Sequence, residues 1–223
     1  MEQLDIFENI LLDDIVVDRF YTEYKNNTEF KSWLDGFLPE VEMCEQQEQH
    51  NPWHKYNVLG HILHSVEEMN KLTIKYNVED MDRKMLAMVM FFHDIGKPAC
   101  HITREKNGEM IDSFFNHNIE SEKVFRRVAG KLRIEDGLVD IMAKMIYKHD
   151  IFMFIKDFPT KNPYWKTLSP EIVAKEIADL DTVGDGKKLM KYLILVGMAD
   201  NLAQNEKMTG DSLRMLGKMI QMV

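Results

Sequence analysis

The chain has 223 residues and a formal net charge of −9, from 28 basic and 37 acidic side chains, with 45% hydrophobic content. This length favours one domain with a substantial core, and the acidic balance excludes a protein that wraps duplex nucleic acid through a basic field. Two cysteines are too few for a disulfide framework or a CxxC zinc site, and no apolar run approaches the roughly 20 residues that cross a bilayer, which predicts a cytoplasmic protein without a membrane partner.

Helical spacing of apolar residues dominates the chain. Apolar side chains recur three and four residues apart over residues 4–20, 58–72, 85–92, 119–132, 138–146, 170–180 and 189–202, and each stretch is predicted to be an α-helix. Ser169 before Pro170 is typical of a helix start, and Gly96 before Pro98 is typical of a helix stop. The first stretch is expected either to cap the core or to serve as an interface.

One segment carries a β pattern. Residues 100–104 and 110–114 are short β-capable runs on either side of Asn107-Gly108, which predicts a hairpin. Residues 152–167, which include Pro159 and Pro163, are expected to form a structured loop. No repeat or Gly/Ser linker interrupts the chain, so we predict a single, mostly helical domain.

Two further patterns have ordinary structural interpretations. The 17 methionines could form an adaptable binding surface, but their places in helical apolar stripes favour core packing. Residues 184–188 resemble a phosphate-binding loop only superficially. A P-loop needs a glycine where Asp181 stands and a hydroxyl where Lys188 stands, so a turn between helices is expected.

Histidine and aspartate placement is the main clue to function. His93 and Asp94 end the most apolar predicted helix. An ionised aspartate buried there without a partner would be costly, and a metal ion would remove that cost, because imidazole and carboxylate are natural metal ligands. Alternatively, Asp94 caps the helix and His93 is an ordinary core histidine.

Other candidates lie on or beside predicted helices. His61 lies at the edge of a buried stripe, a position that suits a ligand reaching into a pocket, whereas His64 points toward solvent. His149 extends an apolar face, where a lone histidine is more often a core residue than a ligand, and His117 precedes a predicted helix. Asp200 shares a face with Gly197 on a helix that is apolar nearly all round, and we expect the glycine to leave room for a cation.

Together these residues resemble a known family. The matching residues are His61, His93, Asp94, Ile95, Gly96, Lys97, Pro98, His117, His149 and Asp200, with further matches such as Gln49, His50, Trp53 and His54. They resemble the HD-domain superfamily of metal-dependent phosphohydrolases, above all the HD domain of bacterial and phage tRNA CCA-adding nucleotidyltransferases and poly(A) polymerases. The resemblance covers about residues 35–205 and leaves residues 1–34 as an N-terminal helical extension.

The resemblance implies a fold and a site. The fold is an all-α HD-domain helical bundle with one small β-hairpin. The residues His61, His93, Asp94 and Asp200 would bind one divalent metal, and His117 and His149 would hold a second, with Asp94 bridging the two. Lys97 would lie close to the substrate phosphate. The nucleotidyltransferase head of those enzymes is not recognised in residues 1–37, so nucleotide addition is not expected.

These residue types suit phosphoester hydrolysis. A divalent metal makes a nucleophile available from water near neutral pH and polarises the phosphoryl group. Imidazole and carboxylate ligands favour Mn, Fe, Co, Ni or Zn, as one or two ions, with Mg as a further option. We expect Asp94, Lys97 and His117 to be the catalytic residues, with His117 or His149, when free of metal, as a proton donor. Lys97 and His54 are the expected substrate-binding residues, although the loop around His54 could equally be a packed loop.

The leading hypothesis is therefore a metal-dependent phosphohydrolase for nucleotide-type phosphomonoesters or cyclic phosphodiesters, for example 2′,3′-cyclic nucleotides. Its partners would be a nucleotide or small phosphoester, and RNA 3′ ends are a further candidate. The alternative is a non-catalytic, metal-containing module that binds RNA or protein. A nucleoside-triphosphate or alarmone hydrolase ranks lower, because the extra charged signatures expected for those branches are not found. Oligomeric state is left open.

Overall fold

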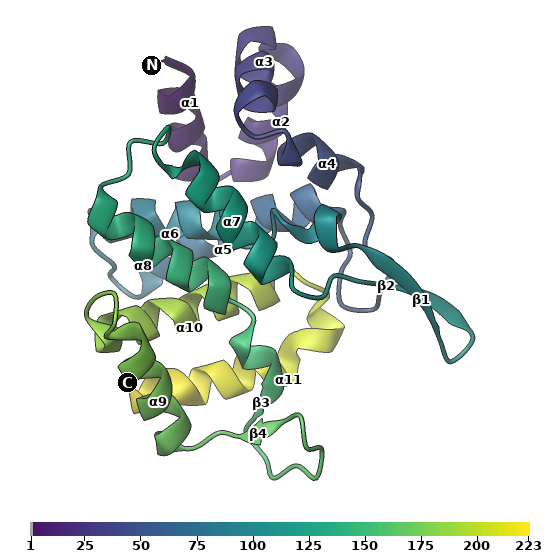
Figure 1. Ribbon diagram of the computed structural model, residues 1–223, viewed down its shortest axis with the longest axis vertical. Coiled ribbons are helices and arrows are strands. Elements are labelled where there is room, and N and C mark those ends of the chain that lie inside the picture. The colour runs from purple at the N-terminus through teal and green to yellow at the C-terminus, as the bar shows by residue number, and fades with distance from the viewer. Residues whose placement is uncertain (1) are drawn as a thin grey trace.

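Helices make up most of the structure, a computed structural model in which residues 2–223 are described (Figure 1). The α-helices are α1 (Glu2–Leu11), α2 (Val16–Asn26), α3 (Thr28–Phe37), α4 (Glu40–Gln46), α5 (Val58–Lys75), α6 (Asp80–Phe92), α7 (His117–Ala129), α8 (Asp136–Lys148), α9 (Pro170–Leu180), α10 (Gly186–Leu202) and α11 (Glu206–Met219). Short 3₁₀ segments lie at η1 (Lys97–Cys100), η2 (Ile151–Phe154) and η3 (Ile220–Met222). The predicted helical fold is confirmed.

The helices are arranged around α5, which packs against α2, α4, α6 and α10. In Figure 1, α1 to α3 lie above this centre, α5 to α8 cross the middle, and α9 to α11 lie below. Helices α7 and α8 pack against each other, and α10 packs against both α9 and α11. The middle layer and α10 bring residues from distant parts of the sequence into one region.

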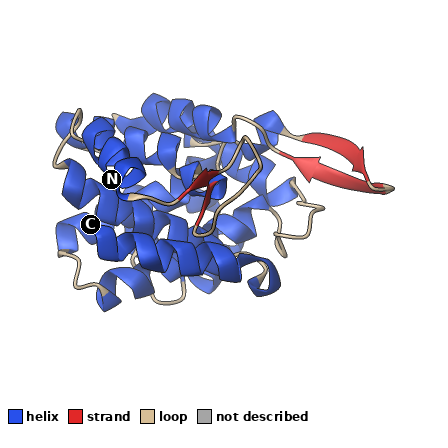
Figure 2. Cartoon of the chain, turned by 90° about the horizontal axis from the view of Figure 1, so that it is seen from below, coloured by secondary structure: helices blue, strands red, loops and turns tan. Residues whose placement is uncertain are grey.

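The predicted β-hairpin is confirmed. Strands β1 (Ile102–Lys106) and β2 (Glu109–Ser113) pair antiparallel, and Asn107 and Gly108 at the turn both have positive φ, as a tight hairpin turn requires. Figure 2 shows the hairpin projecting beyond the helical body. The segment expected to be only a loop also contains a two-residue parallel pair, β3 (Ile155–Lys156) with β4 (Lys166–Thr167).

The N-terminal prediction of one continuous helix is wrong. The chain breaks after α1, where the Asp13 side chain accepts a hydrogen bond from the Ile15 backbone in a local turn, and it restarts as α2 at Val16. Helices α3, α4 and α11 were not predicted. Helix α4, with 7 residues, is too short to give a clear periodic signal, whereas α11, with 14 residues, was missed although its length allows one. Helix α9 has the predicted bounds.

The N-terminal helices cap the core. The ring of Phe7 lies 4.8 Å from that of Phe91, and Phe20 lies 6.1 Å from the same ring, so α1, α2 and α6 share one aromatic cluster. The methionines of α6 and α8 that the sequence placed in apolar stripes, Met85, Met88, Met90, Met142 and Met145, are all buried, which confirms their core assignment.

Two other expectations can be compared with the structure. Residues 184–188 form a turn and a helix start, in which Asp185 accepts from the Lys188 backbone, as predicted. Within residues 2–223, no helix combines the length and the apolar character that a bilayer span requires.

Candidate metal centre

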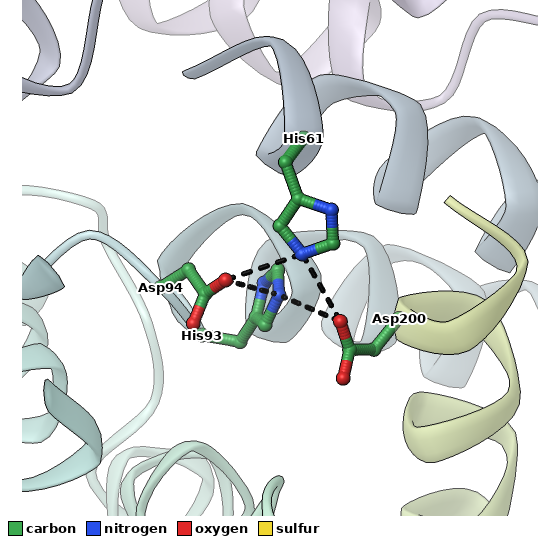
Figure 3. Close-up of side chains that lie close together, drawn as sticks. All are labelled: His61, His93, Asp94 and Asp200. Carbon is green, nitrogen blue, oxygen red and sulfur yellow. Dashed lines mark ion pairs between the residues drawn. The ribbon is translucent and has the colours of Figure 1, made fainter. Parts of the chain in front are cut away.

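Three helices bring four candidate ligands together. His61 lies in the second turn of α5, whose first turn is capped by Asn57 through a hydrogen bond from the Gly60 backbone. His93 and Asp94 follow the end of α6, whose last eight residues are all buried. Asp200 lies near the end of α10. Figure 3 shows the His61 ring directed between the two carboxylates.

The distances in this four-residue cluster are those of groups around a shared centre. His61 Nε2 lies 3.2 Å from Asp94 Oδ2 and 3.0 Å from Asp200 Oδ1. His93 Nε2 lies 3.3 Å from the same Asp94 oxygen and 3.9 Å from the same Asp200 oxygen. One ligand atom from each residue lies within 4.8 Å of all the others. We call these four residues the first cluster.

The first cluster is almost closed to solvent. The side chains of His61, His93 and Asp94 are 1%, 0% and 2% exposed, and that of Asp200 is 17% exposed. Despite the short distances, neither His61 Nε2 nor His93 Nε2 forms a hydrogen bond with any group in residues 2–223. A buried nitrogen without a partner is costly, and a cation between the nitrogens and the carboxylates would satisfy all four groups.

Hydrogen bonding decides which way the His93 lone pair points. His93 Nδ1 lies 2.5 Å from the Met90 carbonyl oxygen, an acceptor, so this nitrogen carries the proton. The neutral ring then presents a lone pair on Nε2 to the Asp94 carboxylate. A lone pair facing an anion is repulsive unless positive charge lies between them. A backbone carbonyl that orients a histidine in this way is typical of metal sites.

A second cluster adjoins the first and consists of Asp94, His117 and His149. Asp94 Oδ1, the oxygen not used in the first cluster, lies 3.1 Å from His117 Nε2 and 3.5 Å from His149 Nε2. Both rings donate through Nδ1 to carbonyl oxygens, those of Phe114 and Ile146, each at 2.7 Å. Their Nε2 atoms therefore face each other at 3.0 Å, which requires a proton or a metal ion between them.

The electrostatics of the site favour a cation. Burial alone would raise the pKa of Asp94, but His93 and Lys97 hold it well below its usual range. Burial opposes ionisation of Asp200 as well, yet His61 lowers its pKa. For His149, burial opposes protonation, but the Asp94 carboxylate raises the pKa to about 9. Two ionised carboxylates thus lie in a buried site. Both clusters fit divalent metal ions by ligand type and closeness, and the first cluster also by its unsatisfied nitrogens.

Lys97 and His54 lie beside the clusters. The Lys97 ammonium contacts Asp94 Oδ2 at 2.5 Å, Gln49 Oε1 at 3.0 Å and His54 Nε2 at 3.2 Å. Lys97 as a whole is only 5% exposed. The His54 ring packs edge-on against that of His61, and burial together with Lys97 lowers its pKa well below the usual value. Lys97 therefore supplies a fixed positive charge, and His54 is a neutral acceptor for it.

Two glycines lie near the site, and one of them, Gly197, has a different role from the one expected. A side chain at Gly197 would meet the Phe152 ring at 2.7 Å, so this glycine makes room for Phe152 and not for a cation. Gly96 is crowded by the first turn of α7, where a Cβ would lie 2.5 Å from the Ser121 nitrogen. Because the Gly96 N–H also bonds the Ser121 hydroxyl at 2.9 Å, the turn that contains His93 and Asp94 is fixed directly to α7, the helix that carries His117.

The structure brings together all six residues that the sequence proposed as ligands, and it leaves His64 outside. His64 stacks on Tyr56, with ring centroids 4.1 Å apart. Sequence reasoning assigned no role to Gln49, which holds Lys97, or to Gln204, which donates to Asp200 Oδ1 at 3.0 Å. Gln204 could have been found from its i+4 spacing, but no local pattern connects Gln49 to Lys97.

The chain matches a known protein-family model. Comparison with protein-family models gives a match to the HD domain over residues 58–203, well over half of the chain, and this range contains both clusters. No curated protein matches the chain. The matched range and the two His/Asp clusters agree: the chain belongs to the HD-domain family.

Proposed function

We propose that the protein is a metal-dependent phosphohydrolase that acts on nucleotide-type phosphomonoesters or cyclic phosphodiesters, such as 2′,3′-cyclic nucleotides. The observation that carries the proposal is the sharing of Asp94 by two adjoining clusters, one oxygen to each. Such a bridging carboxylate suits a pair of ions, which is a recurrent arrangement in phosphoester hydrolysis. Membership of the HD family points the same way.

The types of ligand in the two clusters narrow the choice of metal ion. Imidazole nitrogens and carboxylates favour Mn, Fe, Co, Ni or Zn, with Mg as a weaker option because it prefers oxygen ligands and keeps its water. The first cluster would hold one ion and the second cluster a further one. When bound, the metal supplies Lewis-acid activation of water and of the phosphoryl oxygens.

The protein groups have separate roles in this proposal. Asp94 holds both clusters together through its two oxygens. Lys97 provides the fixed positive charge beside the reacting phosphoryl group, and its burial strengthens that charge because solvent screens it little. His117 is the less buried ring of the second cluster, with 12% of its side chain exposed, and is the proposed proton donor to the leaving oxygen. His54 is the proposed contact to the substrate.

Several finer assignments belong to the same proposal. We infer a relationship to the HD domain of CCA-adding nucleotidyltransferases, supported by the run from His93 to Pro98. One domain is supported by the core cluster, which includes side chains from α1 to α11. A cytoplasmic location is supported by two free cysteines, Cys44 and Cys100, in the described chain.

The test combines metal analysis with turnover. Purified protein is analysed for bound metal and assayed with 2′,3′-cyclic AMP and p-nitrophenyl phosphate, before and after chelation and with Mn or Ni restored. The proposal expects chelator-reversible turnover that is lost in Asp94→Asn and kept in Asp157→Asn, a control carboxylate that bonds Arg214 and Lys218 on α11. Protein without metal and without turnover after Mn or Ni addition would exclude it.

A second candidate function is supported by the loop between β3 and β4. Lys161 lies in this loop and Lys156 and Lys166 lie in the strands that flank it, in a chain of net charge −9. In the same loop, Tyr164 is 79% exposed and Trp165 is 39% exposed. Exposed aromatic rings beside lysines suit stacking on single-stranded bases. The alternative is therefore a non-catalytic, metal-containing module that binds RNA, including RNA 3′ ends, or a protein.

Two measurements separate the candidates. A labelled single-stranded RNA should bind the wild type and lose affinity for Tyr164→Ala if the loop is an RNA surface, and no binding would count against it. Asp94→Ala distinguishes the role of the metal through turnover, because removal of the metal lowers thermal stability in either case. An enzyme would lose metal-dependent turnover in this variant, whereas a purely structural site would show loss of stability with no turnover in the wild type to lose.

A further inference from the structure

The connection between α4 and α5 supplies two of the three groups that hold Lys97. A lysine ammonium has three N–H donors, and here Asp94, Gln49 and His54 each offer an acceptor within 3.2 Å. Gln49 and His54 both belong to residues 49–54, which we call the Lys97 loop. The direction in which Lys97 points therefore depends on where this loop lies.

Hydrogen bonds to Asn51 hold the Lys97 loop together. Its side-chain oxygen accepts from the Trp53 backbone at 3.1 Å, the His54 backbone at 3.2 Å and His54 Nδ1 at 2.8 Å. Because Nδ1 of His54 is the donor, Nε2 presents its lone pair to Lys97. The loop thus behaves as one unit, and its position is decided by what anchors it.

Two anchors hold the loop at its two ends. At the far end, Asn205 donates to the carbonyl oxygens of Trp53 at 2.7 Å and Pro52 at 2.9 Å, which ties the loop to the start of α11. At the Gln49 end, Asp112 Oδ2 accepts from the His50 backbone N–H at 2.8 Å and from His50 Nδ1 at 2.9 Å. The anchor next to Gln49 is therefore a side chain of β2.

Asp112 is itself firmly held. Its other oxygen, Oδ1, accepts from His101 Nε2 and from the Thr103 hydroxyl, each at 2.8 Å, both on or beside β1. The residue is 5% exposed. A buried carboxylate with four donors is a rigid support, and the hydrogen bonds from His101 and the His50 backbone hold its pKa below the usual value although burial opposes this.

We propose that Asp112 is a positioning residue of the metal centre, which holds the Lys97 loop so that Gln49 and His54 keep the Lys97 ammonium directed at Asp94. The kinetic part of this inference rests on the proposed phosphohydrolase function. Lys97 is a point charge on a flexible stem, so its placement must come from its partners. Asp112 touches neither a metal ligand nor Lys97 itself, and it acts through the loop alone.

The direct test measures Lys97 and does not need turnover. In Asp112→Asn, the negative charge is lost and an amide NH₂ replaces one acceptor oxygen. The two N–H donors of His50 then either face this NH₂ or bond a neutral amide oxygen, which is a weaker acceptor than a carboxylate, while the hydrogen bond from the backbone N–H of residue 112 to the His50 carbonyl remains. We expect acetic anhydride to label Lys97 about tenfold faster in this variant, measured by peptide mass spectrometry. Lys148 is the internal reference, because it is 8% exposed and paired with Glu176 and Asp179.

The control variant is Asp157→Asn, which also removes a nearly buried, doubly paired carboxylate, with 4% of its side chain exposed. It should lower thermal stability without changing the ratio of Lys97 to Lys148 labelling. An unchanged ratio in Asp112→Asn, or an equal change in the control, would overturn the inference whether or not the protein hydrolyses phosphoesters.

The kinetic test is a double-mutant cycle with Lys97→Met. With metal content unchanged, Asp112→Asn should lower kcat/KM by about 10- to 100-fold, as expected for a partner outside the ligand set. In the Lys97→Met background, Asp112→Asn should lower kcat/KM no further, because Asp112 acts through the Lys97 ammonium, which this variant already lacks. Additive losses, or loss of bound metal in Asp112→Asn, would overturn the inference. If wild type shows no turnover with Mn or Ni, the proposed function fails, and the labelling result still decides the role of Asp112.

Discussion

The first and second clusters share Asp94 but differ in the burial of the helices that carry their other ligands. In the first cluster, His61 lies near the start of α5 and Asp200 near the end of α10, and both helices are buried along most of their length. In the second cluster, His117 begins α7 and His149 directly follows α8, and fewer than half of the residues of these two helices are buried. Segments with fewer buried contacts open more readily.

The difference between the clusters predicts that they have different roles in metal binding and turnover. The first cluster has four residues and little exposure, which suits tight retention of an ion. The second cluster has three residues, of which Asp94 also belongs to the first cluster and His117 is partly exposed. A site with an accessible ligand leaves room for substrate to approach. We therefore expect the first cluster to decide whether metal binds, and the second to tune turnover.

The largest expected effect comes from the first cluster. His61→Gln should remove its metal and lower kcat/KM by more than the roughly 100-fold loss that outer partners cause. Metal analysis and steady-state kinetics measure both quantities. His64→Gln is the matched control on the same helix, because His64 stacks on Tyr56 outside the cluster, and it should keep metal and turnover. Full metal content in His61→Gln would contradict the assignment of metal binding to the first cluster.

A smaller effect is expected from the second cluster. His117→Gln should keep the metal of the first cluster and lower kcat/KM by about 10- to 100-fold. Metal per chain should fall by no more than one ion relative to wild type. Loss of all bound metal in this variant would show that the two clusters are not separable.

Metal removal should appear as a loss of stability. At a free metal concentration about 100 times its Kd, binding contributes about 2.7 kcal/mol, so chelation should lower the Tm by roughly 5 to 11 °C for a chain of this size. Differential scanning calorimetry with and without chelator measures the shift. Asp94→Asn should show almost no shift, and an equal shift in that variant would mean that the ion binds elsewhere.

The smallest effect on the site is expected from Asp157→Asn, which should change neither metal content nor turnover. Arg214 and Lys218 hold the pKa of Asp157 below its usual value, so the charged carboxylate stabilises the fold above its unfolded pKa of about 3.9. The Tm gap between wild type and variant should be complete at neutral pH. It should narrow only as pH falls below that value, and a gap that stays constant down to acid pH would contradict this assignment.

Part of the fold was predictable because it depends on local patterns. The periodicity of residues 170–180 predicted α9 with its observed bounds, and Asn107-Gly108 predicted the hairpin turn. The break between α1 and α2 was missed, because apolar spacing continues across a turn that is stabilised by local hydrogen bonds of Asp13 and by the Asn70 side chain of α5, which donates to the carbonyls of Leu11 and Asp13. Short helices such as α4 give too few repeats for a periodic signal.

The candidate site was predictable in its members but not in its connections. The run from His93 to Pro98 and the scattered His and Asp residues were visible in the sequence, and the fold brings the six proposed ligands into two clusters. The prediction that Gly197 makes room for a cation failed, because spacing along one helix cannot show that Phe152 occupies the space. The importance of Gln49 and Asp112 was equally invisible from spacing.

The sequence alone determined the helical character of the chain, its hairpin and the residue types from which a cation site could be made, since these follow from side-chain chemistry and from contacts a few residues apart. Only the tertiary structure decided which oxygen of Asp94 faces which histidines, which ring nitrogens carry protons, and how Asp112 reaches Lys97 through residues 49–54. Those relations join groups far apart in the chain, and they depend on how α5, α6, α7, α8 and α10 pack, which no local pattern encodes.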